Sequence, residues 1–200
     1  MTTAVASGGG VANAVTFIRG TTATKMLWPE SSLPSTFTFC SVTRYVGHTR
    51  RRILTCIGSP TQFPNANWLH GHTQSKRGVA WYYHTYTSSV NHGDRDDWLV
   101  MCGTNAGATA PGNMIIDQDE IGTGNGGSGS GRLNIGYFEP SDWALHSVLI
   151  WDYSLGTVPA LWHTSATLSQ VLLTWFFPWC DLRMRRTIFS GQDDWGRRYS

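Results

Sequence analysis

The sequence predicts an all-β fold in which two antiparallel sheets pack face to face as a sandwich. Short apolar runs recur at intervals of roughly ten residues, separated by glycine, asparagine and proline. Helical periodicity is nearly absent before residue 160. Residues 143–152 are apolar on both alternating faces, which is typical of a strand in the middle of a layered structure, covered on both sides.

The predicted strands are short runs rich in β-branched and aromatic residues. In chain order they span residues 13–19, 36–45, 52–57, 67–71, 79–87, 97–102, 114–116, 133–135 and 144–153. In the run 36–45, a bulge or a change of face near the end is needed to sort Phe37, Phe39, Ser41 and Val42 or Tyr45. Strict alternation in the last run puts these residues on one face: Trp143, Leu145, Ser147, Leu149 and Trp151.

Composition narrows the class of protein. The chain has 200 residues, 40% of them hydrophobic, which suffices for one principal domain. A net charge of +2, from 15 basic and 13 acidic residues, argues against a nucleic-acid-binding surface. Only 14% of residues are charged, which favours a secreted β protein. No stretch reaches the ~20 apolar residues that span a membrane.

Three segments follow from these patterns. Residues 1–12 are small and glycine-rich and predict a flexible, irregular N-terminal arm. Residues 13–156 contain the sandwich. Residues 157–200 hold many aromatic residues without a repeated alternation. We expect this C-terminal extension to pack on the sandwich or on a neighbouring subunit, because an exposed Trp-Phe-Phe-Pro-Trp sequence would promote aggregation.

Four cysteines, Cys40, Cys56, Cys102 and Cys180, predict disulfides in an oxidising compartment. They show no Cys-x-x-Cys spacing, so a zinc ribbon or a thioredoxin-type site is not expected. Three pairings are possible, and the sequence alone does not choose among them.

Metal binding is one candidate chemistry. His70 and His72 lie on one side of an extended segment, where they suit either a shared metal or buried hydrogen bonds. Asp117, Asp119 and Glu120 offer oxygen ligands for calcium, and so does the acidic turn 94–97. For both acidic segments, a solvated turn is the simpler explanation.

Carbohydrate binding is a second candidate chemistry. In the run 81–86, Tyr82, His84 and Tyr86 share a face, where they would form a flat platform for stacking on a sugar ring. The alternative is that these aromatic residues are simply favourable strand formers.

Hydrolysis is a third candidate. Glycosidases need two carboxylates facing each other across a cleft. Glu30, Glu120 and Glu139 are the three glutamates of the chain, and Glu139 and Asp142 lie at a turn, where turn hydrogen bonds explain them equally well. We therefore expect no catalytic residues.

Several motifs in register resemble a known family. They are Leu33–Tyr45, Arg52–Leu54, Asn67–His72, Gly78–Ala80, Asp97–Thr104, Gly126–Leu133, Glu139–Ala144 and Ile150–Asp152. Over residues 12–156 the chain is similar to the concanavalin-A-like (laminin-G-like) jelly-roll domains of extracellular proteins of algae and other protists, including mastigoneme-type proteins. The chain departs from that pattern at residues 73–77 and beyond Gly156.

The resemblance carries its own expectations. It implies a jelly-roll sandwich, a disulfide between Cys40 and Cys102, and Cys56 and Cys180 left as a second pair. It also places Trp68 and His70 in a structural motif, so we prefer buried hydrogen bonds to a metal site for His70 and His72. The family further points to extracellular fibres or surface coats.

Together these observations predict a non-enzymatic, secreted structural subunit of an extracellular fibre or surface appendage. It would self-assemble as a homo-oligomeric filament through its terminal segments and aromatic surfaces, with polysaccharide or attached O-glycans as further partners. It would need no cofactor, calcium being the one candidate ion. A lectin-like carbohydrate-binding module is the alternative, and a glycoside hydrolase comes third.

Overall fold

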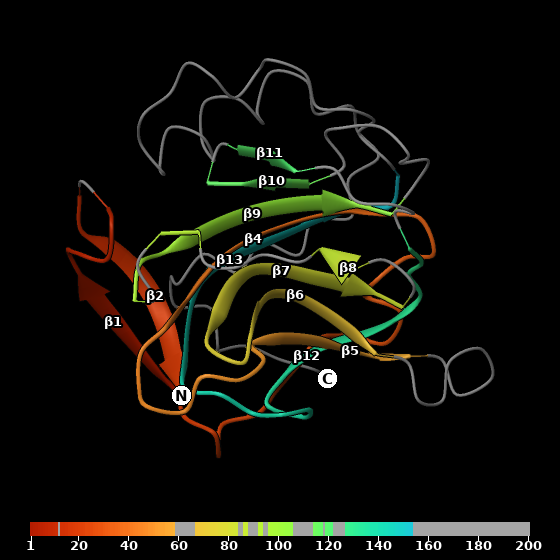
Figure 1. Ribbon diagram of the computed structural model, residues 1–200. Helices are drawn as coiled ribbons and strands as arrows, with labels where there is room; N and C mark the ends of the chain where they lie inside the picture. The colour runs from red at the N-terminus through yellow and green to blue at the C-terminus, as the bar shows by residue number, and fades with distance from the viewer. Residues whose placement is uncertain are drawn as a thin grey trace, which may run out of the picture.

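Two antiparallel sheets pack against each other, as the sequence predicts (Figure 1). The computed structural model describes residues 1–11, 13–58, 67–83, 86–87, 92–93, 96–105, 114–117, 119–121 and 127–153. For residues 86–87, 115 and 119–121 it describes the backbone alone. All strand pairs in both sheets are antiparallel.

The larger sheet has seven strands in the spatial order β1-β2-β13-β4-β9-β10-β11. The bounds of these strands are β1 Thr2–Ala6, β2 Val15–Gly20, β13 Trp143–Trp151, β4 Thr38–Tyr45, β9 Leu99–Thr104, β10 Met114–Ile116 and β11 Asp119–Ile121. The long strands β13, β4 and β9 lie side by side at its centre. Segments more than a hundred residues apart in the chain therefore pair directly, as Cys40 does with Leu149.

The smaller sheet has six strands in the order β3-β12-β5-β6-β7-β8. The bounds are β3 Met26–Leu27, β12 Gly131–Ile135, β5 Leu54–Gly58, β6 Trp68–Thr73, β7 Lys76–Tyr82 and β8 Tyr86–Thr87. The single strand expected over residues 79–87 is divided in two, because Tyr83 adopts a φ of 61° after β7.

Aromatic side chains fill the space between the sheets. Phe37 packs edge-on against Tyr82, with ring centroids 5.0 Å apart, and Phe39 packs edge-on against Trp68 at 5.4 Å. Such pairs contribute about 0.5–1.5 kcal/mol beyond the area that they bury. Part of the tryptophan content is thus explained by a single core.

In β4, the regular alternation is preserved. Phe37, Phe39 and Tyr45 all belong to the core between the sheets, whereas Val42 and Cys40 belong to apolar clusters on the opposite face. The prediction of a bulge or a change of face near the end of this strand was wrong. Residues 37, 39 and 45 are all odd-numbered, so simple alternation already places them on the same face.

The irregularity lies in β13 instead. Its register against β4 shifts between Leu145 and Ser147, so that His146 is the extra residue of a β-bulge. Trp143 and Leu145 therefore share the core with Val148, whereas Trp151 packs with the outer cluster. The strict alternation predicted for this strand was wrong. Its position between β2 and β4, with apolar clusters on both faces, is confirmed.

The N-terminal arm also differs from the prediction. Thr2–Ala6 is not irregular but forms strand β1, which pairs with β2 from Thr2↔Arg19 to Ala6↔Val15. The glycine-rich part is the connection, where Gly8, Gly9 and Gly10 all have positive φ. Residues 157–200 lie outside the described part of the chain. Within the described part, no helix long and apolar enough to cross a membrane is found.

Candidate functional site

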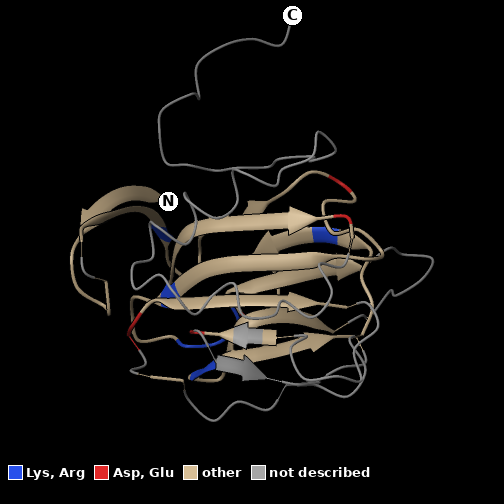
Figure 2. Cartoon of the chain, turned by 90° about the horizontal axis from the view of Figure 1, so that it is seen from above, with Lys and Arg blue, Asp and Glu red and all other residues tan. Residues whose placement is uncertain are grey.

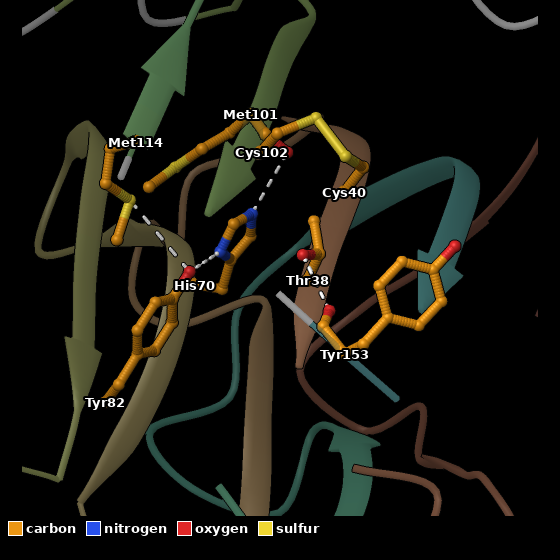
Figure 3. The surroundings of a disulfide bond; sticks show 8 residues. All are labelled: Thr38, Cys40, His70, Tyr82, Met101, Cys102, Met114 and Tyr153. Carbon is orange, nitrogen blue, oxygen red and sulfur yellow. Dashed lines mark hydrogen bonds between the residues drawn. A yellow bond between two sulfur atoms is a disulfide. The ribbon is translucent and has the colours of Figure 1, made fainter. Parts of the chain in front are cut away.

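A network of buried polar side chains lies between the two sheets, centred on His70 of β6. The ring of His70 is fully buried. Its Nδ1 lies 2.6 Å from the hydroxyl oxygen of Tyr82, and its Nε2 lies 3.2 Å from the carbonyl oxygen of Met101 (Figure 3). A carbonyl oxygen only accepts hydrogen bonds, so Nε2 carries the proton and Nδ1 accepts from the hydroxyl of Tyr82.

This network holds both residues neutral. Burial lowers the pKa of His70 to about 3 and raises the pKa of Tyr82 well above its usual value. The two rings are nearly parallel, with an interplanar angle of 4°. Through its hydrogen bonds, the pair joins β6 to β7 and to β9 of the other sheet.

His72 lies next to this network. The register of β6 against β7 shifts between Gly71 and His72, and Gly71 has a φ of 95°. The ring Nδ1 lies 3.2 Å from the hydroxyl oxygen of Thr43 in the other sheet. Burial and then the charge of Arg77 lower the pKa of His72 well below its usual value. Our interpretation of His70 and His72 as buried, hydrogen-bonding histidines is confirmed.

Tyr82 corrects the sugar-platform hypothesis. Its side chain is fully buried among the core aromatics, because the face of β7 that it occupies points toward the other sheet. It cannot stack on a sugar from solvent. His84 and the side chain of Tyr86 lie outside the described residues, so for these two the hypothesis stays a prediction.

Asp117, one of the three calcium candidates, is bound by other groups of the protein, and the calcium hypothesis as a whole stays a prediction. One carboxylate oxygen accepts from the backbone N–H of Val100 at 2.9 Å, and the other accepts from Nη2 of Arg77 at 2.6 Å. Burial raises the pKa of Asp117, and the charge of Arg77 opposes that rise. The carboxylate thus serves as the counter-ion of a guanidinium whose side chain is 2% exposed.

The other two calcium candidates, Asp119 and Glu120, lie in β11, and their side chains are outside the described part. Among the described residues, no group of three or more histidine, cysteine or acidic residues is placed to hold a metal ion.

The remaining acidic candidates make ordinary structural bonds. Asp142 accepts from the backbone N–H groups of Thr22 at 3.2 Å and Thr49 at 3.0 Å. Glu139 pairs with Arg52 at 2.7 Å. These contacts confirm the simpler explanation, that Glu139 and Asp142 serve a turn. In the acidic turn 94–97, Asp96 pairs with Arg50 at 2.6 Å.

The Cys40–Cys102 disulfide is confirmed. The two residues are direct register partners on β4 and β9, and Figure 3 shows the bond between them. The disulfide clusters with Trp151 on the outer face of the larger sheet. The second pair is not tested, and it stays a prediction. Cys56 itself is a free, buried thiol, and burial raises its pKa to about 12. Its proposed partner Cys180 lies outside the described residues. Cys56 sits in the core between the sheets, where β5 directs its side chain.

Sequence reasoning missed an aromatic cluster on the outer face of the larger sheet. The guanidinium carbon of Arg44 lies 4.9 Å from the ring centroid of Trp98 and 5.4 Å from that of Phe17. Burial lowers the pKa of Arg44, against the opposing charges of Asp96 and Asp97. The alternation of β4, which turns residue 44 away from the core, was the available signal.

Comparison with known proteins adds no name to this fold: no family model, no curated protein sequence and no solved structure matches the chain. The concanavalin-A-like resemblance therefore stays a prediction from the motifs.

Proposed function

We propose that this chain is a non-enzymatic structural subunit of an extracellular fibre or surface appendage, built on a disulfide-linked sandwich of concanavalin-A-like type. Its task would be to present stable, apolar surfaces and edges to further copies of itself. Polysaccharide or attached glycans would be secondary partners.

The carrying observation is that the larger sheet is apolar on both faces. One face makes the core, whereas the other holds two clusters, around Phe17 with Trp98 and around Trp151 with the disulfide. The outer face of an antiparallel sheet is usually polar, because water covers it. Phe17, Trp98 and Trp151 are already buried within the chain, so this sheet is built to carry a further layer on its outer face, as subunits of a packed assembly do.

The positions of the reactive side chains support the same proposal. His70 and His72 are buried, bonded to Met101 and Thr43 across the core, and Asp117 is bonded to Arg77. A catalytic base must reach a substrate proton within hydrogen-bonding distance. In their present places these groups stabilise the sandwich instead.

A direct test is negative-stain electron microscopy of the full chain under non-reducing conditions, with light scattering over a range of concentrations. We expect regular filaments or large ordered assemblies. A sample that stays monomeric at every concentration would overturn the proposal. So would turnover of a β-glucan that Glu120→Gln abolishes, or saturable polysaccharide binding by a monomer that Tyr86→Ala abolishes.

A further inference from the structure

Among the described residues, the N-terminal strand β1 forms a sheet edge without the usual protection. Exposed edges offer unpaired N–H and C=O groups, and proteins commonly protect them by brevity, charge or proline. The other edge strands of the described part follow this rule, since β3 and β8 have two residues each and β11 has three, two of them acidic. In contrast, β1 has five residues, Thr-Thr-Ala-Val-Ala, with neither charge nor proline.

The surroundings of β1 strengthen this difference. Figures 1 and 2 show β1 as the outermost strand of a hairpin that extends away from the two layers, and its ribbon carries no charge colour. No charged side chain occurs from Met1 to Ile18. Val5 is 66% exposed, an unusual exposure for an apolar side chain in a strand. Two copies can thus approach through this edge without repulsion between charged side chains.

The two faces of β1 have different roles. Ala4 and Ala6 pack on the outer aromatic cluster with Phe17 and Trp98. Thr3 and Val5 have the opposite parity and are exposed. A strand added beside β1 would extend the apolar face with its own alanines and would cover Val5 on the other face.

We propose that β1 pairs antiparallel with β1 of a second copy across a twofold axis, in the register centred on Ala4. This inference rests on the proposed function, because it identifies one of the contacts of self-assembly. In this register Thr3 of each copy faces Val5 of the other, which places two β-branched side chains in a cross-strand pair. The alanines at positions 4 and 6 of both copies lie on one face, so the outer apolar surface continues from one molecule to the next.

Cysteine cross-linking tests the register. Thr3→Cys and Val5→Cys are made separately, one carrying a mass tag, then mixed and oxidised gently. We expect the mixed pair to cross-link at least about fivefold faster than either variant alone, because only mixing places two cysteines in a direct cross-strand pair. The parent chain, which keeps Cys56 and Cys180, is the control and should give no disulfide-linked dimer.

A charged residue introduced into β1 tests the β1–β1 contact without adding a cysteine. Val5→Lys should weaken dimerisation about tenfold or more, since the lysine protects the edge. Thr16→Lys is the matched control: Thr16 is exposed and is the register partner of Val5, but β2 is not an edge strand. Sedimentation velocity measures the dimer, and thermal melting checks that both variants stay folded.

The outcomes separate the two proposals. If Val5→Lys assembles into filaments like the parent chain and the cysteine variants fail to cross-link, the β1 contact is wrong while the structural-subunit proposal stands. A parent chain that is monomeric throughout overturns both. Equal cross-linking of mixed and single variants would refute the register centred on Ala4.

Discussion

At the residue scale, several side chains that were candidates for a binding or catalytic site form hydrogen bonds that stabilise the core. His70 is the clearest example: Tyr82 donates to one ring nitrogen, and the other donates to Met101 in the opposite sheet. A buried polar group is costly unless it is bonded, and a satisfied network fixes the relative position of the layers. Histidine and tyrosine therefore specify how the sheets align, besides filling space.

The buried histidines predict acid lability. His70 and His72 are neutral in the fold, whereas an unfolded histidine takes up a proton near pH 6.5. The unfolded state therefore binds more protons below that pH. Stability is fully present above pH 6.5 and falls as the pH drops toward 3, the folded pKa of His70, by about 1.4 kcal/mol per pH unit for each histidine.

Urea unfolding at pH 7.5, 6.0 and 5.0 measures this effect, with His70→Gln as the comparison. The variant is expected to lose stability at every pH but to show a shallower pH slope, because one proton-linked site is gone. An identical slope in the two proteins would show that His70 is not buried in its neutral form. Burial also lowers the pKa of His146, so this residue adds to the loss of stability at low pH in both proteins.

Asp117 makes a second prediction at this scale. Asp117→Asn should cost about 2 kcal/mol, because it removes the carboxylate that faces the buried Arg77. Asp96→Asn is the matched control: its carboxylate pairs with Arg50 but its side chain is 63% exposed, so the cost should stay below about 1 kcal/mol. Chemical denaturation measures both. A calcium-dependent rise in melting temperature that Asp117→Asn abolishes would contradict the structural role.

At the element scale, β13 shows how one extra residue assigns side chains to faces. The bulge at His146 brings Val148 into the core with Leu145 and turns Trp151 to the outer cluster. A shift of one residue reverses every later side chain in a strand. Strand β13 tolerates this reversal, because it carries apolar side chains on both faces and both faces lie against apolar surroundings.

Two single-residue deletions test the bulge. Deleting His146 should leave later residues on their present faces, since it removes the extra residue, and should cost at most about 2 kcal/mol. Deleting Leu149 removes one residue as well, but it moves Ile150 outward and Trp151 inward, and should cost several kcal/mol or prevent folding. Circular dichroism and thermal melting compare the two. Equal losses would show that the bulge does not set the faces.

At the scale of the whole molecule, the fold depends on pairings between distant segments. The central strand β4 pairs with β9 on one side and with β13, about a hundred residues later, on the other. Such non-local pairing makes folding slow, because loops must close before contacts form. The disulfide between β4 and β9 reduces this cost, since it joins two central strands 62 residues apart.

The disulfide should therefore affect both stability and folding rate. Replacing Cys40 and Cys102 by alanine together is expected to cost about 4 kcal/mol in the chain-entropy account, and to slow refolding. Urea equilibrium and stopped-flow refolding measure the two effects. Parent protein treated with reductant is the control and should match the double variant. Unchanged stability in that variant would show that the bond does not constrain the unfolded chain.

The sequence by itself determined the all-β class and the positions of most strands, because alternation and turn residues act within a few residues of chain. It indicated the short strands β3 and β11 poorly, and it missed β1, because small residues with glycine resemble a flexible segment. The pairing of Cys40 with Cys102 came from the resemblance alone.

Only the tertiary structure decided which face of each strand is buried and what its polar residues do. Tyr82 was a candidate for a sugar platform, with a role as an ordinary strand former as the alternative. It instead binds His70 in the core, because the choice of face depends on the opposite sheet. Asp117 was a candidate calcium ligand or a residue of a solvated turn, and its carboxylate binds Arg77, forty residues earlier in the chain. Local patterns report on neighbours in sequence, whereas burial and bonding partners are set by segments that only folding brings together.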